Sequence, residues 1–179
     1  MKSISKKTTR EQLAAIITEA LAKQSISAVL VGGSVVSIYS ENEYESRDLD
    51  FISPSDHSKI RTVMEDLGFE AEGKDFTHPK TDFSVEFPTG PLAIGDDVPV
   101  KAEGELKVGN VRIKMFSPTQ AVMDRLAWYY FSNDMQCLDQ AIMICKKQKI
   151  KLEKVKSWSR REGELEKFEA FLKRLQLEK

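Results

Sequence analysis

Two aspartates one residue apart, Asp48 and Asp50, alternate with apolar residues. Side chains at i and i+2 of a strand point to the same face, so this pattern predicts a strand with both carboxylates on its polar face. A third acid, Glu86, lies between apolar neighbours in a second alternating stretch. If the two strands pair, three carboxylates meet, and a cation such as Mg²⁺, or Mn²⁺ in its place, would neutralise them.

A glycine pair precedes the aspartates. Gly32 and Gly33 end an apolar, β-branched run at residues 26–31, and Ser34 is placed to cap the short helix that follows. Backbone N–H groups at such a turn, together with the helix N-terminus, attract anions. Thirteen residues separate Ser34 from Asp48, which is room for one short helix and a return to the adjacent strand. The sequence therefore predicts phosphate held by the turn beside a cation held by the acids, although paired acids on a solvated strand and glycine turns are also common without such a role.

Strand and helix patterns mix in the first part of the chain. Alternating and buried-run patterns predict strands, and apolar residues at helical spacing predict helices. The expected elements are a helix opened by a capping box of Thr8 and Glu11, a strand at 26–31, a short helix after Ser34, a strand at 48–52, a helix ending at Gly68, one short strand within 69–80, a strand at 83–87, a loop at 92–102 and a hairpin at 106–115.

From Ser117 onward the pattern is helical. Ser117-Pro118 reads as an N-cap followed by proline at the first helical position, and Asn133-Asp134 breaks and recaps the chain. The predicted fold is therefore α/β (α+β): a small mixed sheet flanked by helices over residues 1–116, followed by a helical region over 117–179. The active cleft is expected between these two parts.

Composition excludes few partners. The chain has 179 residues, 41% hydrophobic and 31% charged, with a formal net charge of -1, so no overall basic field favours nucleic acid. One local stripe is basic. A solvated helix face is a simpler interpretation of this stripe than a binding site for a polyanion. Its members, with Glu153 as the single acid among them, are Lys146, Lys147, Lys149, Lys151, Lys154, Lys156, Arg160 and Arg161.

The remaining sequence features predict a cytoplasmic protein. Cys137 and Cys145 lie two turns apart on a predicted helix, too far for a disulfide, and are expected to be thiols in a reducing compartment. No apolar run is long enough for a membrane span, and the basic N-terminus lacks the apolar segment of a signal peptide.

The order of these motifs resembles a known family. Val31-Gly32-Gly33-Ser34, then Asp48-Leu49-Asp50, then Val85-Glu86-Phe87 is similar to the nucleotidyltransferase superfamily that includes DNA polymerase β. The chain is most similar to its small bacterial branch, related to abortive-infection and toxin-type nucleotidyltransferases. The stretch from Pro118 through Asp124-Arg125-Leu126 to Asp139 resembles the downstream segment of that branch.

The resemblance assigns roles to residues. Gly32, Gly33 and Ser34 would contact the phosphates of an NTP substrate, and Arg125 would meet the triphosphate unless it is an exposed helical arginine paired with Asp124. The three acids Asp48, Asp50 and Glu86 would be catalytic and hold the metal. The sequence departs from the minimal nucleotidyltransferases after Ser34, where Val35-Val36 replaces their Ala-Arg-Gly, so the phosphate contacts are expected to differ.

The function implied by the resemblance is metal-dependent transfer of a nucleoside monophosphate from NTP to an acceptor hydroxyl, releasing pyrophosphate. The acceptor could be RNA, such as tRNA, a protein or a small molecule. One alternative is a toxin of a toxin–antitoxin or phage-defence pair, which would have an antitoxin partner. Another is a non-catalytic module of the same fold that binds RNA or nucleotides. No membrane partner is expected.

Overall fold

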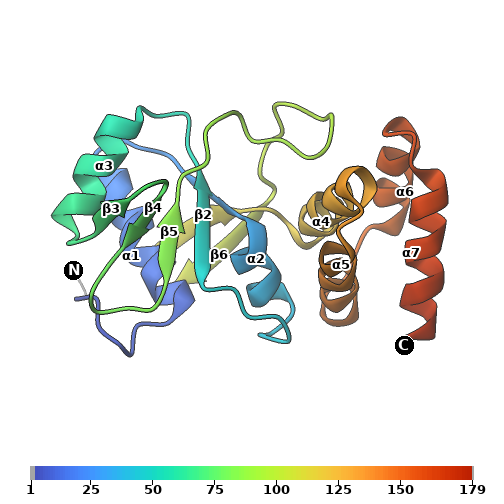
Figure 1. Ribbon diagram of the computed structural model, residues 1–179, viewed down its shortest axis with the longest axis horizontal. Helices are drawn as coiled ribbons and strands as arrows, with labels where there is room; N and C mark the ends of the chain where they lie inside the picture. Colours follow the sequence, from blue (N-terminus) through green and yellow to red (C-terminus); the bar gives the residue numbers. More distant parts are fainter. Residues whose placement is uncertain (1–2, 179) are drawn as a thin grey trace.

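The described part of the chain, residues 3–178, is built on one mixed sheet of seven strands. The computed structural model describes residues 3–178, and the strands follow the order β3-β4-β5-β2-β1-β7-β6 (Figure 1). The pairs β2–β5 and β1–β7 are parallel, and the other pairs are antiparallel. The strands are β1 (Val29–Val31), β2 (Asp48–Ile52), β3 (Glu70–Glu72), β4 (Asp75–Thr77), β5 (Ser84–Glu86), β6 (Gly104–Val108) and β7 (Val111–Met115).

Helices cover the sheet and, up to residue 178, form the second part of the chain. Figure 1 shows α1 and α3 on one side of the sheet, with α4 to α7 beyond its other end. The helices are α1 (Arg10–Lys23), α2 (Gly32–Tyr39), α3 (His57–Asp66), α4 (Pro118–Ser132), α5 (Met135–Lys147), α6 (Leu152–Arg161) and α7 (Leu165–Leu177). The predicted α/β class is confirmed.

The two faces of the sheet differ in polarity. Residues of one face, including Leu30, Leu49 and Val85, are fully buried. Because side chains alternate along a strand, Asp48, Asp50 and Glu86 belong to the opposite face. The apolar face anchors the strands in the core, and this anchoring holds the acids in place.

Local turn and cap chemistry explains where the predicted elements shift. The capping box of α1 is formed by Thr9 and Gln12. The predicted pair, Thr8 and Glu11, lies one residue earlier in the sequence and fits the same motif. The first strand begins at Val29, because Ile26 still donates to the carbonyl of Leu21 at the end of α1. Residues 69–80 hold two strands rather than one, since Gly73 adopts a φ of +65° and turns the chain into a hairpin.

The helical part begins as predicted. The hydroxyl of Ser117 accepts from the N–H of Gln120, and Pro118 opens α4. Asn133 ends α4 in the left-handed region at φ 52°, and Asp134 caps α5 through the N–H of Cys137. Helix α2 contacts both α4 and α5, and one hydrophobic cluster extends through the sheet and the helices. The second part of the chain is thus packed directly against the end of the sheet that carries α2.

Half of the cations in the basic stripe at residues 146–161 are ion-paired. Four of its eight cations meet carboxylates: Lys146 with Glu178, Lys147 with Glu41, Lys154 with Glu103 and Arg161 with Asp97. These contacts agree with the simpler interpretation of a solvated surface. Among residues 3–178, no helix combines the length and the apolar character that crossing a membrane requires.

Candidate active site

The three acids lie on two neighbouring parallel strands in register. Asp50 of β2 is the direct partner of Glu86 of β5, and Asp48 is the partner of Ser84. The hydroxyl of Ser84 donates to Asp48 Oδ1 at 2.5 Å and so positions that carboxylate. Lys74, at the tip of the β3–β4 hairpin, donates to Glu86 Oε2 at 3.0 Å. The structure therefore brings the predicted acids to one place on the sheet.

Burial and nearby carboxylates raise the proton affinity of Asp50. The pKa of Asp50 rises from its ordinary value of 3.8 to about 6, first through burial and then through the nearby carboxylates of Glu86 and Asp48. Arg125 and Lys74 oppose this shift without cancelling it. A site that gathers negative charge in this way favours a cation.

The glycine turn runs directly against these acids. Gly32 has φ +70°, a conformation that side chains disfavour, and a Cβ at this position would overlap the carboxylate of Asp50. A Cβ on Gly33 would come within 2.9 Å of Ser46 Oγ. Both glycines lie in the first turn of α2, where backbone N–H groups lack partners within the helix. The backbone of this first turn thus lies directly against the carboxylate of Asp50.

Ser34 is placed differently from the prediction. It is fully buried, and its hydroxyl donates to the carbonyl of Asp48 at 2.5 Å. It does not cap α2, whose N-cap is Val31 without a side-chain hydrogen bond. The helix starts earlier than the sequence suggested because glycine at position 32 can make the turn itself. Ser34 therefore ties α2 to the strand of the acids, and only its backbone remains for a phosphate.

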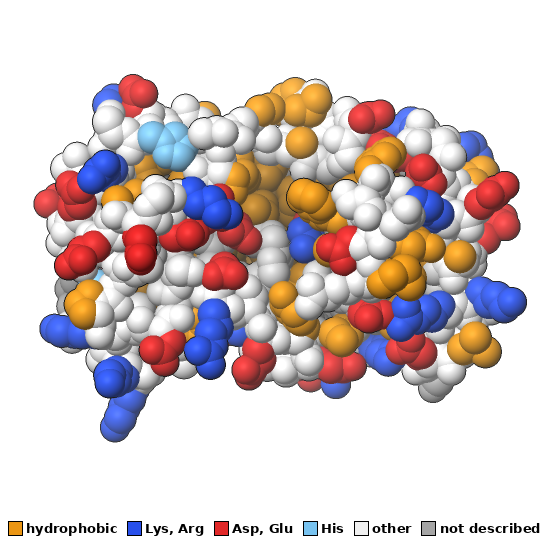
Figure 2. Space-filling view, viewed as in Figure 1, with side chains coloured by type: hydrophobic (Ala, Val, Ile, Leu, Met, Phe, Trp, Pro, Cys, Tyr) orange, Lys and Arg blue, Asp and Glu red, His pale blue; other side chains and the backbone are white. Residues whose placement is uncertain are grey.

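A cavity of about 500 Å³ separates the strands from the helices at this point. Figure 2 shows acidic side chains gathered over the strand-bearing part, beside a hollow in the middle of the molecule. The strand wall consists of Gly32, Gly33, Tyr44, Ser46, Asp48, Asp50, Lys74, Asp75 and Glu86. The helix wall consists of Arg125, Trp128, Asp134, Gln136, Cys137 and Gln140.

Arg125 reaches the cavity from a buried position. Its side chain is 12% exposed and meets Asp124 Oδ2 through Nη2 at 2.6 Å. Nη1 donates to Gln140 Oε1 at 3.4 Å. Burial opposes the charge, but Asp124 outweighs it, so the pKa of Arg125 is raised. One of the two predictions for Arg125, an ion pair with Asp124, is confirmed. Arg125 lines the cavity, however, and does not lie on the open surface.

Trp128 and Lys74 are two of the cavity residues to which the sequence assigned no role. Of the consecutive aromatics at 128–130, Trp128 is the one on the helix wall, and it is 54% exposed, whereas Tyr130 is buried in the core. Helical geometry separates such neighbours but does not tell which one faces a cleft. Lys74 was missed because its hairpin lies in the segment read as a single strand; Gly73 was the available signal.

Comparison with solved structures shows the same architecture. An antigenic nucleotidyltransferase-like protein from Paracoccidioides brasiliensis superposes with a TM-score of 0.56 at 16% identity, covering 78% of each chain. The antibiotic-resistance factor ANT(2'')-Ia in solution gives 0.53 at 16% identity, over 94% of this chain and 98% of that one. ANT(2'')-Ia crystallised with adenylyl-2''-tobramycin gives 0.56 at 17% identity, over 93% and 99%. The chain has the nucleotidyltransferase fold. No family model and no curated protein matches its sequence.

On this nucleotidyltransferase fold, two of the three predicted acids are suited to hold a small divalent cation. Asp48 and Asp50 offer carboxylate oxygens on one face, and Mg²⁺ commonly takes one or two carboxylates with substrate phosphates and water. Within residues 3–178, however, no three His, Cys, Asp or Glu side chains are gathered closely enough to hold a metal. Glu86 is engaged by Lys74. The residues thus fit a two-carboxylate site completed by phosphate.

Proposed function

We propose that the chain transfers a nucleoside monophosphate from an NTP to an acceptor hydroxyl and releases pyrophosphate. The observation that carries the proposal is the register of Asp50 against Glu86, with Asp48 on the same face and the Gly32-Gly33 turn against them. The nucleotidyltransferase fold supports it, and nucleotidyl transfer is the general activity that its structural neighbours suggest.

The nucleotide is proposed to lie across the cavity. Its phosphates would accept from the N–H groups of Gly32, Gly33 and Ser34 at the start of α2, and the guanidinium of Arg125 would face them. The half-exposed indole of Trp128 offers a stacking surface for the base. Lys74 is a second cation within the cavity.

The acids are proposed to hold Mg²⁺ or Mn²⁺ and to handle the acceptor proton. Asp48 and Asp50 would hold the cation, joined by Glu86 when Lys74 leaves it; when bound, the cation neutralises phosphate charge and favours deprotonation of the attacking hydroxyl. The acceptor oxygen forms a bond to the α-phosphorus while the bond to the pyrophosphate oxygen breaks. The hydroxyl proton passes to a carboxylate, for which Glu86 is the proposed acceptor.

The acceptor is proposed to be a small molecule before RNA or protein. ANT(2'')-Ia was solved with an adenylylated small molecule, adenylyl-2''-tobramycin. The basic stripe, which was the sequence argument for RNA, has half of its cations in ion pairs. The toxin hypothesis uses the same chemistry and requires growth arrest on expression, relieved by a partner protein.

Labelled transfer tests the proposal. The four α-labelled NTPs are incubated with protein and cell extract, with Mg²⁺ or with EDTA. Wild type is expected to label an acceptor only with the metal, and Asp50→Asn to lose about 1,000-fold or more of that rate. Asp66→Asn, an exposed acid at the end of α3, is the matched control. Equal labelling by Asp50→Asn and wild type would refute the assignment, and nucleotide binding without any transfer would favour the non-catalytic module.

A further inference from the structure

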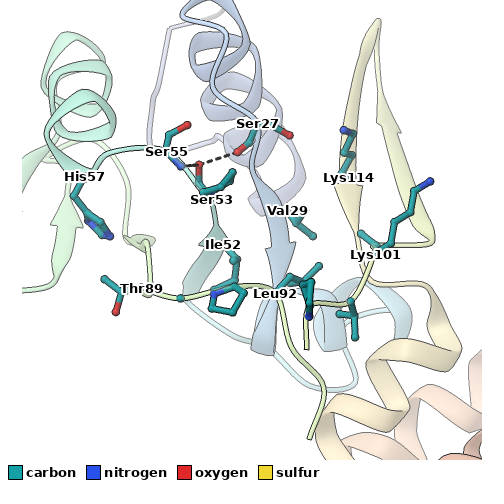
Figure 3. A pocket seen from close by; sticks show the side chains of 16 residues that line it. Ser27, Val29, Ile52, Ser53, Ser55, His57, Thr89, Leu92, Lys101 and Lys114 are labelled. Atoms are coloured by element: carbon teal, nitrogen blue, oxygen red, sulfur yellow. Dashed lines mark hydrogen bonds between the residues drawn. The ribbon is translucent and has the colours of Figure 1, made fainter. Parts of the chain in front are cut away.

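A second cavity, larger than the first, lies on the same face of the sheet as the acids. Its volume is about 720 Å³, within the usual range of small-molecule sites. Val29 and Ile52, which are partners across β1 and β2, form part of its floor, and the loop at residues 89–102 forms a wall. Figure 3 shows Val29, Ile52 and Leu92 around the space.

Both acid-bearing strands run toward this cavity. Ile52 follows Asp50 by two residues on β2, so the two side chains share a face. Glu86 ends β5, and the chain continues into the cavity wall at Thr89. At the usual rise of a strand, the floor at Ile52 begins about 7 Å from Asp50. Neither Asp50 nor Glu86 lines this cavity, so a molecule seated there reaches the acids by extending beyond Ile52 along β2.

The other end of the cavity is basic. Lys114 of β7 lies beside Val29, because Leu30 is the partner of Met115. Lys101 approaches from the loop, and Figure 3 shows both lysines on the side away from His57 and Thr89. Within residues 3–178, no carboxylate forms an ion pair with either lysine; Glu105, the cross-strand partner of Lys114, is bound by Arg112 at 3.3 Å. Two uncompensated cations adjoin an otherwise mostly apolar lining.

The spacing of these features defines a ligand. Strand separation and rise place the Cα of Lys114 about 12 Å from that of Asp50. We infer that this cavity is the acceptor site, and that the acceptor is an elongated small molecule with a hydroxyl at one end, an apolar body and an anionic group at the other. The inference rests on the proposed function, because it assigns the acceptor of that reaction. A polyamine such as tobramycin carries the wrong charge for Lys101 and Lys114.

A matched series of probes tests the charge and the shape. ω-Hydroxylaurate, dodecanediol and aminododecanol share a hydroxyl and an apolar chain but end in an anion, a neutral group and a cation. Binding to the full chain without NTP is measured by calorimetry, and transfer from labelled NTP to each probe is measured separately. The hydroxy acid is expected to bind on the order of tenfold more tightly than the amino alcohol and to be the preferred acceptor.

Charge reversal supplies the variant. Lys101→Glu combined with Lys114→Glu is expected to remove or invert this preference, while Lys107→Glu, an exposed lysine of β6 outside the cavity, is expected to leave it unchanged. If the three probes bind alike, or the double variant keeps the wild-type preference while labelled transfer into extract proceeds, the inference is wrong and the proposed function stands. Charge-selective binding with no transfer from any NTP would overturn both and leave only an anion site.

Discussion

The strand wall and the helix wall of the central cavity hold charge in different ways. On the strand wall, Asp48, Asp50 and Glu86 lie close together, and burial first and then the charges of Glu86 and Asp48 raise the pKa of Asp50 to about 6. On the helix wall, Arg125 is matched by Asp124 at 2.6 Å. A set of like charges without full compensation is poised to receive a ligand, whereas a compensated pair stabilises the wall that carries it. We therefore expect the acids of the strand wall to carry the reaction, and Arg125 and Trp128 of the helix wall to bind the nucleotide.

The largest stability effect is expected from the helix wall. Arg125→Met leaves the Asp124 carboxylate, 17% exposed, without its cation, and should lower the free energy of unfolding by about 3 kcal/mol. Replacing both partners, with Asp124→Leu added, should restore at least half of that loss. Urea denaturation measures both variants. If Arg125→Met alone were as stable as wild type, the claim that Arg125 compensates the charge of Asp124 would be wrong.

The strand wall should respond with the opposite sign. Because the pKa of Asp50 is raised in the folded state, its ionised form destabilises the fold above about pH 6, and this penalty disappears as the pH falls toward 4. In EDTA, Asp50→Asn should therefore raise the free energy of unfolding by about 1–3 kcal/mol at pH 8 and by much less at pH 4.5. Denaturation curves at the two pH values check the sign. A less stable variant at pH 8 would contradict the raised pKa of Asp50.

A smaller effect separates binding from reaction on the helix wall. Trp128→Ala should raise KM for the NTP by about tenfold and leave kcat unchanged, because it removes a stacking surface but no reacting group. Phe131 is also 54% exposed on α4 but does not line the cavity, so Phe131→Ala is the control and should change neither constant. Steady-state kinetics decides between them. Equal effects of the two variants would contradict stacking of the nucleotide base on Trp128.

The sequence was sufficient where a local pattern determines the structure. Ser117-Pro118 and Asn133-Asp134 marked the ends of α4 because caps are local chemistry. Alternation gave the face that Asp48 and Asp50 share, whereas the pairing of their strand with that of Glu86 was a condition of the prediction that the structure meets. The Gly32-Gly33 turn was likewise found from a local pattern.

Other features depend on contacts between distant segments. The sequence pattern predicts Ser34 as a helix cap, but its hydroxyl donates a hydrogen bond to the backbone carbonyl of Asp48, fourteen residues away. Lys74 meets Glu86 only because the β3–β4 hairpin folds back on β5, which no pattern within residues 69–80 reveals. The loop at 92–102 was identified as a loop, but the cavity it forms with Lys114 depends on the sheet order.

The most direct test of the central claim is a pair of measurements on Glu86→Gln, with Glu72→Gln on exposed β3 as the control. If Glu86 takes the acceptor proton and does not bind the NTP, the single-turnover rate of transfer falls by about 100-fold or more, while the dissociation constant of the NTP stays within about threefold of wild type. If NTP binding weakens by the same factor as the rate, or if the rate is unchanged, the assignment of the reaction to the acids of the strand wall is wrong.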